Sequence, residues 1–339
     1  KLSRRSFLIG SLGTALAGCV STKIEARTPI EVRTPVEEVA SFPIIDNHSH
    51  LLPTRLTPRM GTTPTDLLNA MNAAGIDRMV VVGFGPEVPE LPVRHPSRFV
   101  AAYVLYNFRW RQDARFDRLI PADLRIKDGT SHREVEAIGA EFETALKTGL
   151  YNALAEITTV ALPIRGGAIE PGQSALPGST VSPDSPLVMR LMELAARYDL
   201  PINIHCESTA KNRMARALAA NRAARVIWAH TGSYLAPAPI ATLLREHPNL
   251  DFDLSSKNQL YQPRAGSVLS MGRVKEDWRQ LFEAFPDRFY YGVDFLTRRQ
   301  LSLAQAIGES ARALFTQLSP PAARKIAYQN AIRTYRLGT

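Results

Sequence analysis

The chain has 339 residues, of which 45% are hydrophobic and 22% are charged. This balance is that of a globular protein, so a disordered or fibrous chain is excluded, and the length allows one large domain or two ordinary ones. The formal net charge of +9 is spread thinly and is weak evidence for a nucleic-acid partner. The two cysteines, Cys19 and Cys206, are too few for a disulfide framework and lack the Cys-x-x-Cys spacing of a metal site.

The N-terminal segment has the pattern of an export signal. Arg4 and Arg5 precede an uncharged stretch over residues 6–18, which is shorter than the about 20 apolar residues that cross a bilayer. A basic start, a short apolar run and small residues before a boundary are typical of a secretory signal. The Arg4-Arg5 pair followed by Ser-Phe-Leu resembles a twin-arginine signal, and Leu16-Ala17-Gly18-Cys19 resembles a bacterial lipobox. The alternative interpretation is a frayed amphipathic N-terminus.

Three segments follow from this pattern. We predict a signal peptide over residues 1–18, a tether without helical or strand periodicity over residues 19–42, and one folded domain over residues 43–339. Cys19 is the predicted lipidation site, so we expect an exported lipoprotein of the periplasm or cell envelope that meets the membrane through this anchor alone. Because the chain begins with Lys1 rather than Met, we expect a few residues of the signal to precede it.

Beyond the tether, short apolar runs alternate with amphipathic stretches. Eight runs have the composition of buried parallel strands, at residues 43–50, 76–83, 98–106, 151–157, 201–206, 225–230, 249–255 and 288–294. Helices are predicted at residues 63–74, 132–148, 187–198 and 239–246, with two more near 301–317 and 321–336. This alternation predicts an α/β fold, a (β/α)₈ TIM barrel with extra C-terminal helices. A doubly wound open sheet is the alternative, but no glycine-rich phosphate loop follows the first strand.

Histidines gather at the carboxyl ends of the predicted strands, where barrel active sites are built. Four of the seven histidines lie there, namely His48, His50, His205 and His230. Strand parity places Asp294 on the same inward side. In the first strand, parity predicts an inward face made of Asp46, His48 and His50. The opposite face, against the outer helices, is predicted to consist of Ile45, Asn47 and Ser49.

This constellation favours a metal site. A single histidine at a strand end is more often a packing residue, but four of them together with Asp294 reverse that expectation. Imidazole and carboxylate ligands at one pole suit a zinc-like or manganese-like divalent ion.

The same residues lie in four motifs that resemble those of the amidohydrolase superfamily, in its amidohydrolase-2 or amidohydrolase-related branch. The motifs are Ile45-Asp46-Asn47-His48-Ser49-His50, Ile204-His205-Cys206-Glu207, Trp228-Ala229-His230-Thr231-Gly232 and Tyr291-Gly292-Val293-Asp294-Phe295. The resemblance extends from residue 43 to the C-terminus and implies the same barrel fold.

The resemblance also implies ligands. The implied set is His48, His50, Glu156, His205, His230 and Asp294. By the resemblance, His48, His50 and Asp294 hold a first ion. In two-metal members His205 and His230 hold a second ion, whereas in one-metal members His205 alone joins the first site. Glu156 occupies the position of a bridging residue on strand four; a helix-facing carboxylate paired with an arginine is its alternative. A charged group within a barrel strand is costly unless it is paired or ligating. The implied cofactor is one or two divalent ions, with zinc first among them.

The implied chemistry is metal-assisted hydrolysis, in which the ion lowers the pKa of water to about 7 and polarises the substrate. Asp294 is suited to accept the proton of that water. His230 binds metal or stabilises developing charge on the substrate. Asp46 is expected in a supporting role beneath the ligands or in barrel-core pairing.

Basic residues in the loops at this pole suggest an anionic small-molecule substrate. They are Arg109, Arg165, Lys257 and Arg298. Arg165 lies in a long Gly-, Pro- and Ser-rich loop over residues 158–186, and such loops are usually functional. The alternative for these cations is solvated loop charge.

Three functions are consistent with the sequence. The first is a hydrolase of a C–N or C–O bond in an amide, lactone or ester. The second is a metal-dependent decarboxylase of an unsaturated or aromatic acid, and the third is a binding lipoprotein without chemistry. Glu156 and the complete ligand set favour the first. A small-molecule substrate and no nucleic acid are expected, and the oligomeric state is left open.

Overall fold

The computed structural model describes the part of the chain that carries the predicted barrel. The described residues are 39, 41–52, 61–83, 87–104, 131–159, 164–165, 168–169, 181–258, 260 and 266–338. The chain divides into two units, Lys1–Arg33 and Thr34–Thr339, and every described residue belongs to the second. The predicted signal peptide, the lipidation site Cys19 and most of the tether lie outside the described residues.

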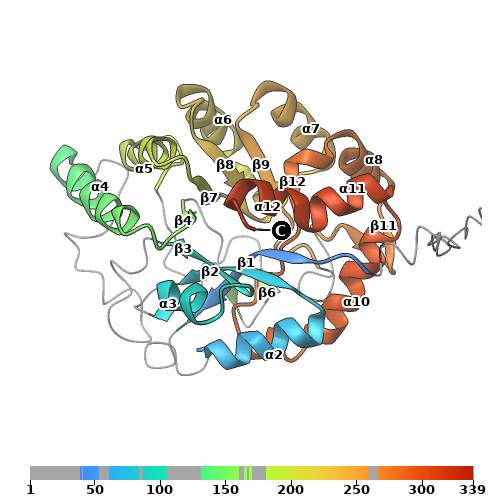
Figure 1. Ribbon diagram of the computed structural model, residues 1–339. Helices are drawn as coiled ribbons and strands as arrows, with labels where there is room; N and C mark the ends of the chain where they lie inside the picture. The colour runs from blue at the N-terminus through green and yellow to red at the C-terminus, as the bar shows by residue number, and fades with distance from the viewer. Residues whose placement is uncertain are drawn as a thin grey trace, which may run out of the picture. The chain divides into compact units, whose positions relative to one another are not determined.

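Eight parallel strands form one sheet among the described residues, in the order β1-β2-β3-β4-β7-β8-β9-β12. They are β1 (Ile45–Leu51), β2 (Arg78–Gly83), β3 (Phe99–Tyr103), β4 (Ala153–Thr158), β7 (Pro201–His205), β8 (Arg225–Trp228), β9 (Leu250–Asp253) and β12 (Phe289–Tyr290). The segment after β12 continues along β1, where Asp294 N donates to His48 O at 2.7 Å and His50 N to Phe295 O at 2.8 Å. The sheet therefore curls into a nearly closed barrel (Figure 1), which confirms the predicted (β/α)₈ fold.

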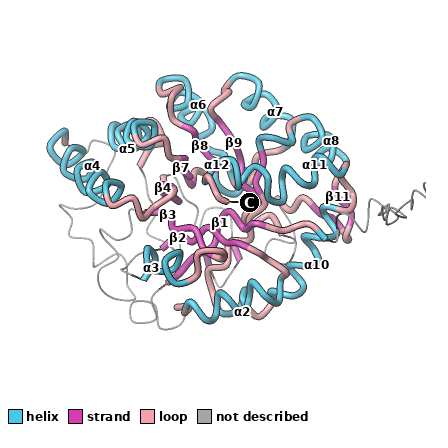
Figure 2. Tube along the Cα trace, viewed as in Figure 1, coloured by secondary structure: helices cyan, strands magenta, loops and turns pink. Residues whose placement is uncertain are grey.

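Helices surround this barrel of strands (Figure 2). They are α2 (Pro64–Ala74), α3 (Glu87–Arg94), α4 (His132–Lys147), α5 (Pro186–Arg197), α6 (Lys211–Ala220), α7 (Pro237–Glu246), α8 (Glu276–Ala284), α9 (Arg298–Leu301), α10 (Ala304–Phe315), α11 (Pro320–Arg324) and α12 (Asn330–Tyr335). The six helical regions given by range are confirmed, whereas the strand–helix alternation gave no range for α3, α6, α8 and α9. Two short hairpins were also not predicted, β5–β6 (Ile164–Arg165 and Ala168–Ile169) and β10–β11 (Leu269–Ser270 and Arg273–Val274).

The sequence sets the ends of α2 locally. Thr63 and Asp66 form a capping box, in which the Thr63 hydroxyl accepts from Asp66 N at 3.1 Å and Asp66 accepts from Thr63 N at 2.9 Å. Gly75 ends the helix at φ 63°, a left-handed conformation that glycine adopts without steric cost. Within the described residues, no helix has the length and apolar character needed to cross a membrane.

Alternate strand residues divide the core into two layers. Met79 and Val81 of β2 pack outward with the helices, whereas Val80 and Val82 pack inside the barrel with Tyr335 of α12. α12 thus contributes to this inner layer, and the extra C-terminal helices pack onto the barrel. The C-terminus lies beside these elements in Figure 1.

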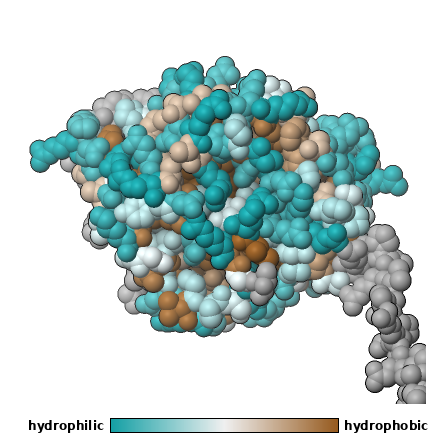
Figure 3. All heavy atoms as spheres, turned by 45° about the horizontal axis from the view of Figure 1, so that its top comes forward, coloured by the Kyte–Doolittle hydropathy of each residue, from teal (hydrophilic) through white to brown (hydrophobic). Residues whose placement is uncertain are grey.

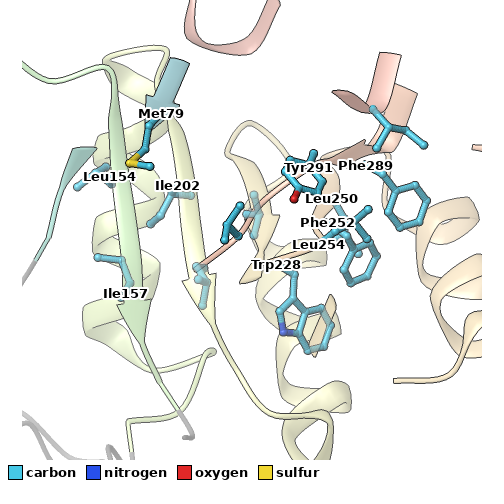
Figure 4. Packing of buried hydrophobic residues seen from close by; sticks show 14 of the residues in the cluster. Met79, Leu154, Ile157, Ile202, Trp228, Leu250, Phe252, Leu254, Phe289 and Tyr291 are labelled. Carbon is cyan, nitrogen blue, oxygen red and sulfur yellow. The ribbon is translucent and has the colours of Figure 1, made fainter. Parts of the chain in front are cut away.

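Aromatic side chains hold together the strands that carry the later histidines. Trp228 stacks on Phe252 with ring centroids 5.7 Å apart, and Phe252 stacks on Phe289 at 6.0 Å, as Figure 4 shows. Trp228 Nε1 also donates to the carbonyl oxygen of Cys206 at 2.7 Å. These contacts fix the ends of β7, β8, β9 and β12 relative to one another. Cys206 itself is a buried core residue.

The face of the molecule in Figure 3 is mostly hydrophilic, with small apolar areas between polar ones. The large apolar side chains that are exposed among the described residues come from different elements, and they are Val93, Leu150, Leu260 and Met271. Singly exposed hydrophobic residues of this kind are normal for a soluble surface.

Candidate metal centre

Two strand irregularities aim ligand side chains into the barrel mouth. The register of β1 against β2 shifts between Asp46 and Ser49, on either side of His48. The register of β4 against β7 shifts between Leu154 and Ile157, on either side of Glu156, whose φ is 39°. Such bulges bend a strand and redirect one side chain, and they are frequent next to active sites.

The bulge in β1 also corrects part of the predicted parity. His48 and His50 both point to the mouth as predicted, but Ile45 packs inside the barrel rather than against the helices. Asp46 accepts from the Ser49 hydroxyl at 2.5 Å and from Val293 N at 2.8 Å, so it joins β1 to the segment after β12. Parity fails because the irregularity shifts the alternation of faces by one residue. Burial raises the pKa of Asp46 to about 7.

Glu156 lies at the centre of the cluster. Its Oε1 is 3.1 Å from Nδ1 of His205, 3.4 Å from Nε2 of His230 and 3.7 Å from Nε2 of His48. Its Oε2 is 3.5 Å from Nε2 of His50. Burial opposes its ionisation, but His50, His205 and the other imidazoles hold the pKa of Glu156 well below its ordinary value. The alternative of a helix-facing carboxylate is wrong, because both oxygens face the imidazoles of the mouth.

Asp294 lies at the edge of the same cluster. Its Oδ1 is 3.1 Å from Nε2 of His50, and its Oδ2 is 3.9 Å from Nδ1 of His230. The Ser256 hydroxyl donates to Oδ2 at 2.5 Å. Burial opposes its ionisation, but His50 and His230 lower the pKa of Asp294 below its ordinary value. The carboxylate therefore carries its negative charge in the folded protein.

Asp253 orients the ring of His48 through a hydrogen bond to Nδ1, the ring nitrogen that faces away from Glu156. Nδ1 of His48 is 3.1 Å from Oδ2 of Asp253. Burial opposes the ionisation of Asp253, but His48 and neighbouring groups keep the pKa of Asp253 far below its ordinary value. The Asp253 carboxylate therefore accepts the hydrogen bond and Nδ1 of His48 donates it. Nε2 is thereby directed to the cluster, and this buried atom has no hydrogen-bond partner among the described residues. A buried nitrogen in this position is suited to ligate an ion.

His205 and His230 are held in the same way. The Ser255 hydroxyl donates to Asp253, so its oxygen accepts from Nδ1 of His230 at 2.7 Å and leaves Nε2 facing Glu156. Nε2 of His205 lies 3.2 Å from Oε1 of Glu207, which leaves Nδ1 facing the centre. Ligating histidines almost always give their other ring N–H to a carboxylate, carbonyl or hydroxyl.

The electrostatics of the cluster favour positive charge at its centre. Burial opposes protonation of His205, but Glu156 and Glu207 raise its pKa to about 10. Burial likewise opposes protonation of His48, but Asp253 and Glu156 raise its pKa well above the ordinary value. Protons supply this charge in part, and a divalent cation competes with them for the same nitrogens.

Three sets of side chains bring their ligand atoms within 4.8 Å of one another. They are His48–His50–Glu156, Glu156–His205–His230 and His48–His230–Asp253. The first two share Glu156, as a carboxylate between two cation positions does. In the third, both oxygens of Asp253 already accept hydrogen bonds, from His48, Asn203, His230 N and Ser255, so Asp253 orients the rings rather than binding an ion. Imidazole nitrogen and carboxylate oxygen are ligands that suit zinc.

A left-handed turn presents His230. The turn Ala229–Gly232 follows β8, and φ is positive at four successive residues, with 55° at His230, 48° at Thr231, 66° at Gly232 and 57° at Ser233. His230 and Thr231 lie in the left-handed α region, and Ser233, with ψ −65°, lies in the γ-turn region. L-residues in such sparsely populated regions cost about 1–3 kcal/mol each, so the three cost about 3–9 kcal/mol together. Strain of this size persists only where the surroundings impose it, and it gathers at functional sites.

The predicted substrate-binding residues lie in different situations. Lys257 is buried, and its Nζ donates to the carbonyl oxygen of Ser233. Arg298 is exposed at the start of α9, and its Nε donates to the carbonyl oxygen of Gly61 at 3.1 Å. Arg165 ends strand β5, but its side chain lies outside the described part, as does all of Arg109. Substrate binding by these residues stays a prediction.

The sequence did not predict the residues that hydrogen-bond to the outer ring nitrogens of the histidines. Asp253 and Ser255 were not predicted as site residues, and Glu207 was noted only as part of a motif. Asp253 could have been found, because it alternates with Asp251 on the seventh strand and a carboxylate inside a barrel strand needs a partner. Ser255 carries no comparable signal.

A parallel (β/α)₈ barrel with histidines and carboxylates at the carboxyl ends of its strands defines the class of barrel enzymes whose sites are built at that pole. A family model described as Amidohydrolase matches residues 45–337. The chain belongs to this amidohydrolase family, which confirms the resemblance. No curated protein sequence gives a significant match.

Solved structures similar to the chain share the fold at low sequence identity. A 2,6-dihydroxybenzoate decarboxylase from Rhizobium is 12% identical over 87% of this chain and 99% of its own, with a TM-score of 0.56. A probable 2-pyrone-4,6-dicarboxylic acid hydrolase from Acinetobacter baumannii is 12% identical over 87% and 100%, with a TM-score of 0.53. An amidohydrolase from Burkholderia multivorans with bound zinc is 14% identical over 88% and 100%, with a TM-score of 0.51.

Proposed function

We propose that the protein is a metal-dependent hydrolase of a C–N or C–O bond in a small amide, lactone or ester. The observation that carries this proposal is the position of Glu156 between two pairs of imidazoles. His48 and His50 lie against it on one side, and His205 and His230 on the other. This donor set offers two adjoining cation positions that share one carboxylate.

The ligand residues and their supports divide the work. His48, His50 and Glu156 would hold one divalent ion, and Glu156, His205 and His230 a second, with zinc the first candidate. The similar Burkholderia amidohydrolase with bound zinc supports this choice of metal. When bound, the metal acidifies a water molecule and polarises the substrate oxygen.

Asp294 is the proposed proton acceptor of the reaction. Its lowered pKa keeps it ionised, and Ser256 and His50 fix both of its oxygens beside the cluster. A carboxylate held in this way is able to take a proton and return it to a leaving group. His230 lies next to it and is the second proposed catalytic residue. For an anionic substrate, we propose binding by Arg109, Arg165 and Arg298.

A decarboxylase is the second candidate. The likeness to the Rhizobium decarboxylase favours it, whereas the likeness to the Acinetobacter hydrolase favours the first candidate by the same measure. The second imidazole pair around Glu156 decides our preference, because two cation positions suit the activation of water for hydrolysis.

The experiment is a substrate screen of the protein stripped with a chelator and reloaded with zinc or manganese. Lactones, amides, esters and aromatic acids are offered, and both hydrolysis and carbon dioxide release are measured. We expect hydrolysis that disappears on stripping and returns on reloading. Release of carbon dioxide instead would make the protein a decarboxylase.

The D294N variant tests the proton acceptor within the same screen. We expect the rate to fall by roughly 10²–10⁴ while zinc content is retained, because Asp294 lies at the edge of the cluster. D287N, which changes an exposed aspartate paired with Lys325, is the matched control and should leave the rate unchanged. Full activity in zinc-loaded D294N would show that Asp294 is not the base.

We also propose export and lipidation. The support is the Arg4-Arg5 pair and the Leu16-Ala17-Gly18-Cys19 motif. Mass spectrometry of the protein from a bacterial envelope should find an acylated N-terminal Cys19, and C19A should abolish that modification. Recovery of an unmodified chain that retains residues 1–18 would contradict this proposal.

A further inference from the structure

Lys257 is a buried cation that the proposed reaction does not use. It follows β9, and only 2% of its surface is exposed. Its own backbone is fixed, because its N–H donates to Leu254 O at 3.1 Å and its carbonyl accepts from Val268 N at 3.3 Å. Its side chain ends on the carbonyl oxygen of Ser233. A side chain buried in this way does not reach out to a substrate, so its contact with Ser233 needs another explanation.

Ser233 directly follows the turn Ala229–Gly232 and is the last of the four successive residues with positive φ. Four successive positive φ values make the turn unfavourable for its three residues that are not glycine. At Gly232 an added Cβ would lie 2.7 Å from Leu235 Cδ1, so the turn is also tightly packed. Contacts from outside must therefore hold it in this conformation.

The end of β9 and the residues that follow it contact the turn at both ends. At the start, Asp253 Oδ1 accepts from His230 N at 2.8 Å, and the Ser255 hydroxyl lies 2.7 Å from Nδ1 of His230. At the end, Lys257 Nζ donates to Ser233 O. Three residues at alternate positions of one segment thus fix the backbone, the ring and the exit of the turn.

The position of the His230 ring depends on these contacts to the turn. Its Nε2 is 3.1 Å from Nδ1 of His205 and 3.4 Å from Oε1 of Glu156. If the turn relaxed to right-handed geometry, the direction of the side chain from the backbone would change and these distances would not be kept.

We propose that Lys257 is a positioning residue, whose amino group holds Ser233 O and thereby keeps the strained turn that aims His230 at Glu156 and His205. The consequence for metal binding rests on the proposed function. The burial of the Lys257 amino group against the carbonyl of Ser233 is explained by the strain that this contact offsets.

The experiment compares K257M with the unmodified protein and with K147M, which changes an exposed lysine on α4. Zinc affinity is measured by competition with a chromophoric chelator, and the absorption spectrum is recorded after loading with cobalt. We expect K257M to bind the second ion at least roughly tenfold more weakly and to show an altered cobalt spectrum. K147M should match the unmodified protein in both.

A second substitution separates positioning from a general loss of stability. Glycine adopts positive φ without steric cost, so S233G in the K257M background should restore part of the zinc affinity and the cobalt spectrum. If K257M does not fold, the K257M/S233G double variant should regain a cooperative unfolding transition. Failure of this rescue, in either form, would overturn the proposal.

A third measurement makes the two proposals separately testable. The ring signals of His230 in the metal-free protein, assigned with H230N after ¹⁵N-histidine labelling, should shift in K257M and recover in the double variant. Unchanged signals together with unchanged zinc affinity would overturn the role of Lys257 and leave the proposed function intact. If the unmodified protein binds no divalent ion, the proposed function fails, and the ring signals still decide the role of Lys257.

Discussion

Replacing Asp253 by asparagine tests how the cluster sets the proton positions of its histidines. An amide has one acceptor oxygen, so its NH₂ group must take the place of Oδ1 or of Oδ2. At Oδ1 it would face the backbone N–H groups of His230 and Ser255, now 2.8 and 3.1 Å away. Leaving two buried donors unpaired costs about 2–6 kcal/mol, at about 1–3 kcal/mol each.

The other orientation of the introduced amide is cheaper in folding energy and worse for the site. At Oδ2 the NH₂ group would face Asn203 and His48. Asn203 can turn its amide, because its Oδ1 is buried and has no partner among the described residues. His48 can accept at Nδ1 only by giving up its Nδ1 proton, which leaves the remaining ring proton on Nε2, the atom that faces Glu156. We therefore expect a loss of about 1–3 kcal/mol in unfolding free energy and an Nε2–H tautomer of His48.

This tautomer blocks the ligand atom of His48, so zinc affinity of D253N should fall roughly 10–100-fold. Chelator competition measures the affinity, and imidazole ¹⁵N shifts of the metal-free protein report whether Nδ1 of His48 still carries a proton, as it does in the unmodified protein. D251N is the matched control, because Asp251 on the same strand pairs with Arg288 and Tyr290 rather than with a histidine. It should lose stability and keep its zinc affinity. Zinc affinity and His48 shifts unchanged in D253N would refute the reasoning.

Three further predictions concern stability. Burial lowers the pKa of Lys257 to about 7, although Glu207 and Asp253 act to raise it. Because the unfolded chain keeps that proton to higher pH, urea titrations should show the protein gaining stability relative to K257M as pH rises from about 7 towards 10. A constant difference in stability between the two proteins would contradict this. G308A should lower the free energy of unfolding by at least about 1–3 kcal/mol, because its Cβ would lie 2.2 Å from Ala74 O, and the thermal midpoint should fall with it. An unchanged midpoint would contradict the α2–α10 contact. Y335F should cost about 1 kcal/mol in urea titrations, because the hydroxyl donates to Asn47 at 2.6 Å, and no loss would show that this bond does not stabilise the packing of α12 onto the barrel.

Periodicity predicted the barrel because each of its layers repeats along the sequence. Short apolar runs marked the eight strands, the carboxyl end of one strand placed His205 at the mouth, and parity placed Asp294 there. The same parity failed at Ile45 and Asp46, because a register shift in β1 depends on the pairing with β2 and leaves no mark in either strand alone.

The supporting residues were harder to predict for a related reason. His48 and Asp253 are 205 positions apart in the chain and meet only through the closed barrel. The left-handed turn at His230 has one glycine, Gly232, and local preference alone would not assign positive φ to Thr231 or Ser233. Long-range contacts impose that conformation, so the role proposed for Lys257 became visible only in the structure.

The number of divalent ions per chain tests the central claim most directly. Inductively coupled plasma mass spectrometry of zinc-loaded protein, after removal of weakly bound metal, should find two ions in the unmodified protein. In E156Q, where a neutral amide replaces the shared carboxylate, it should find one or none. No ion in the unmodified protein, or two tightly bound ions in E156Q, would contradict the account.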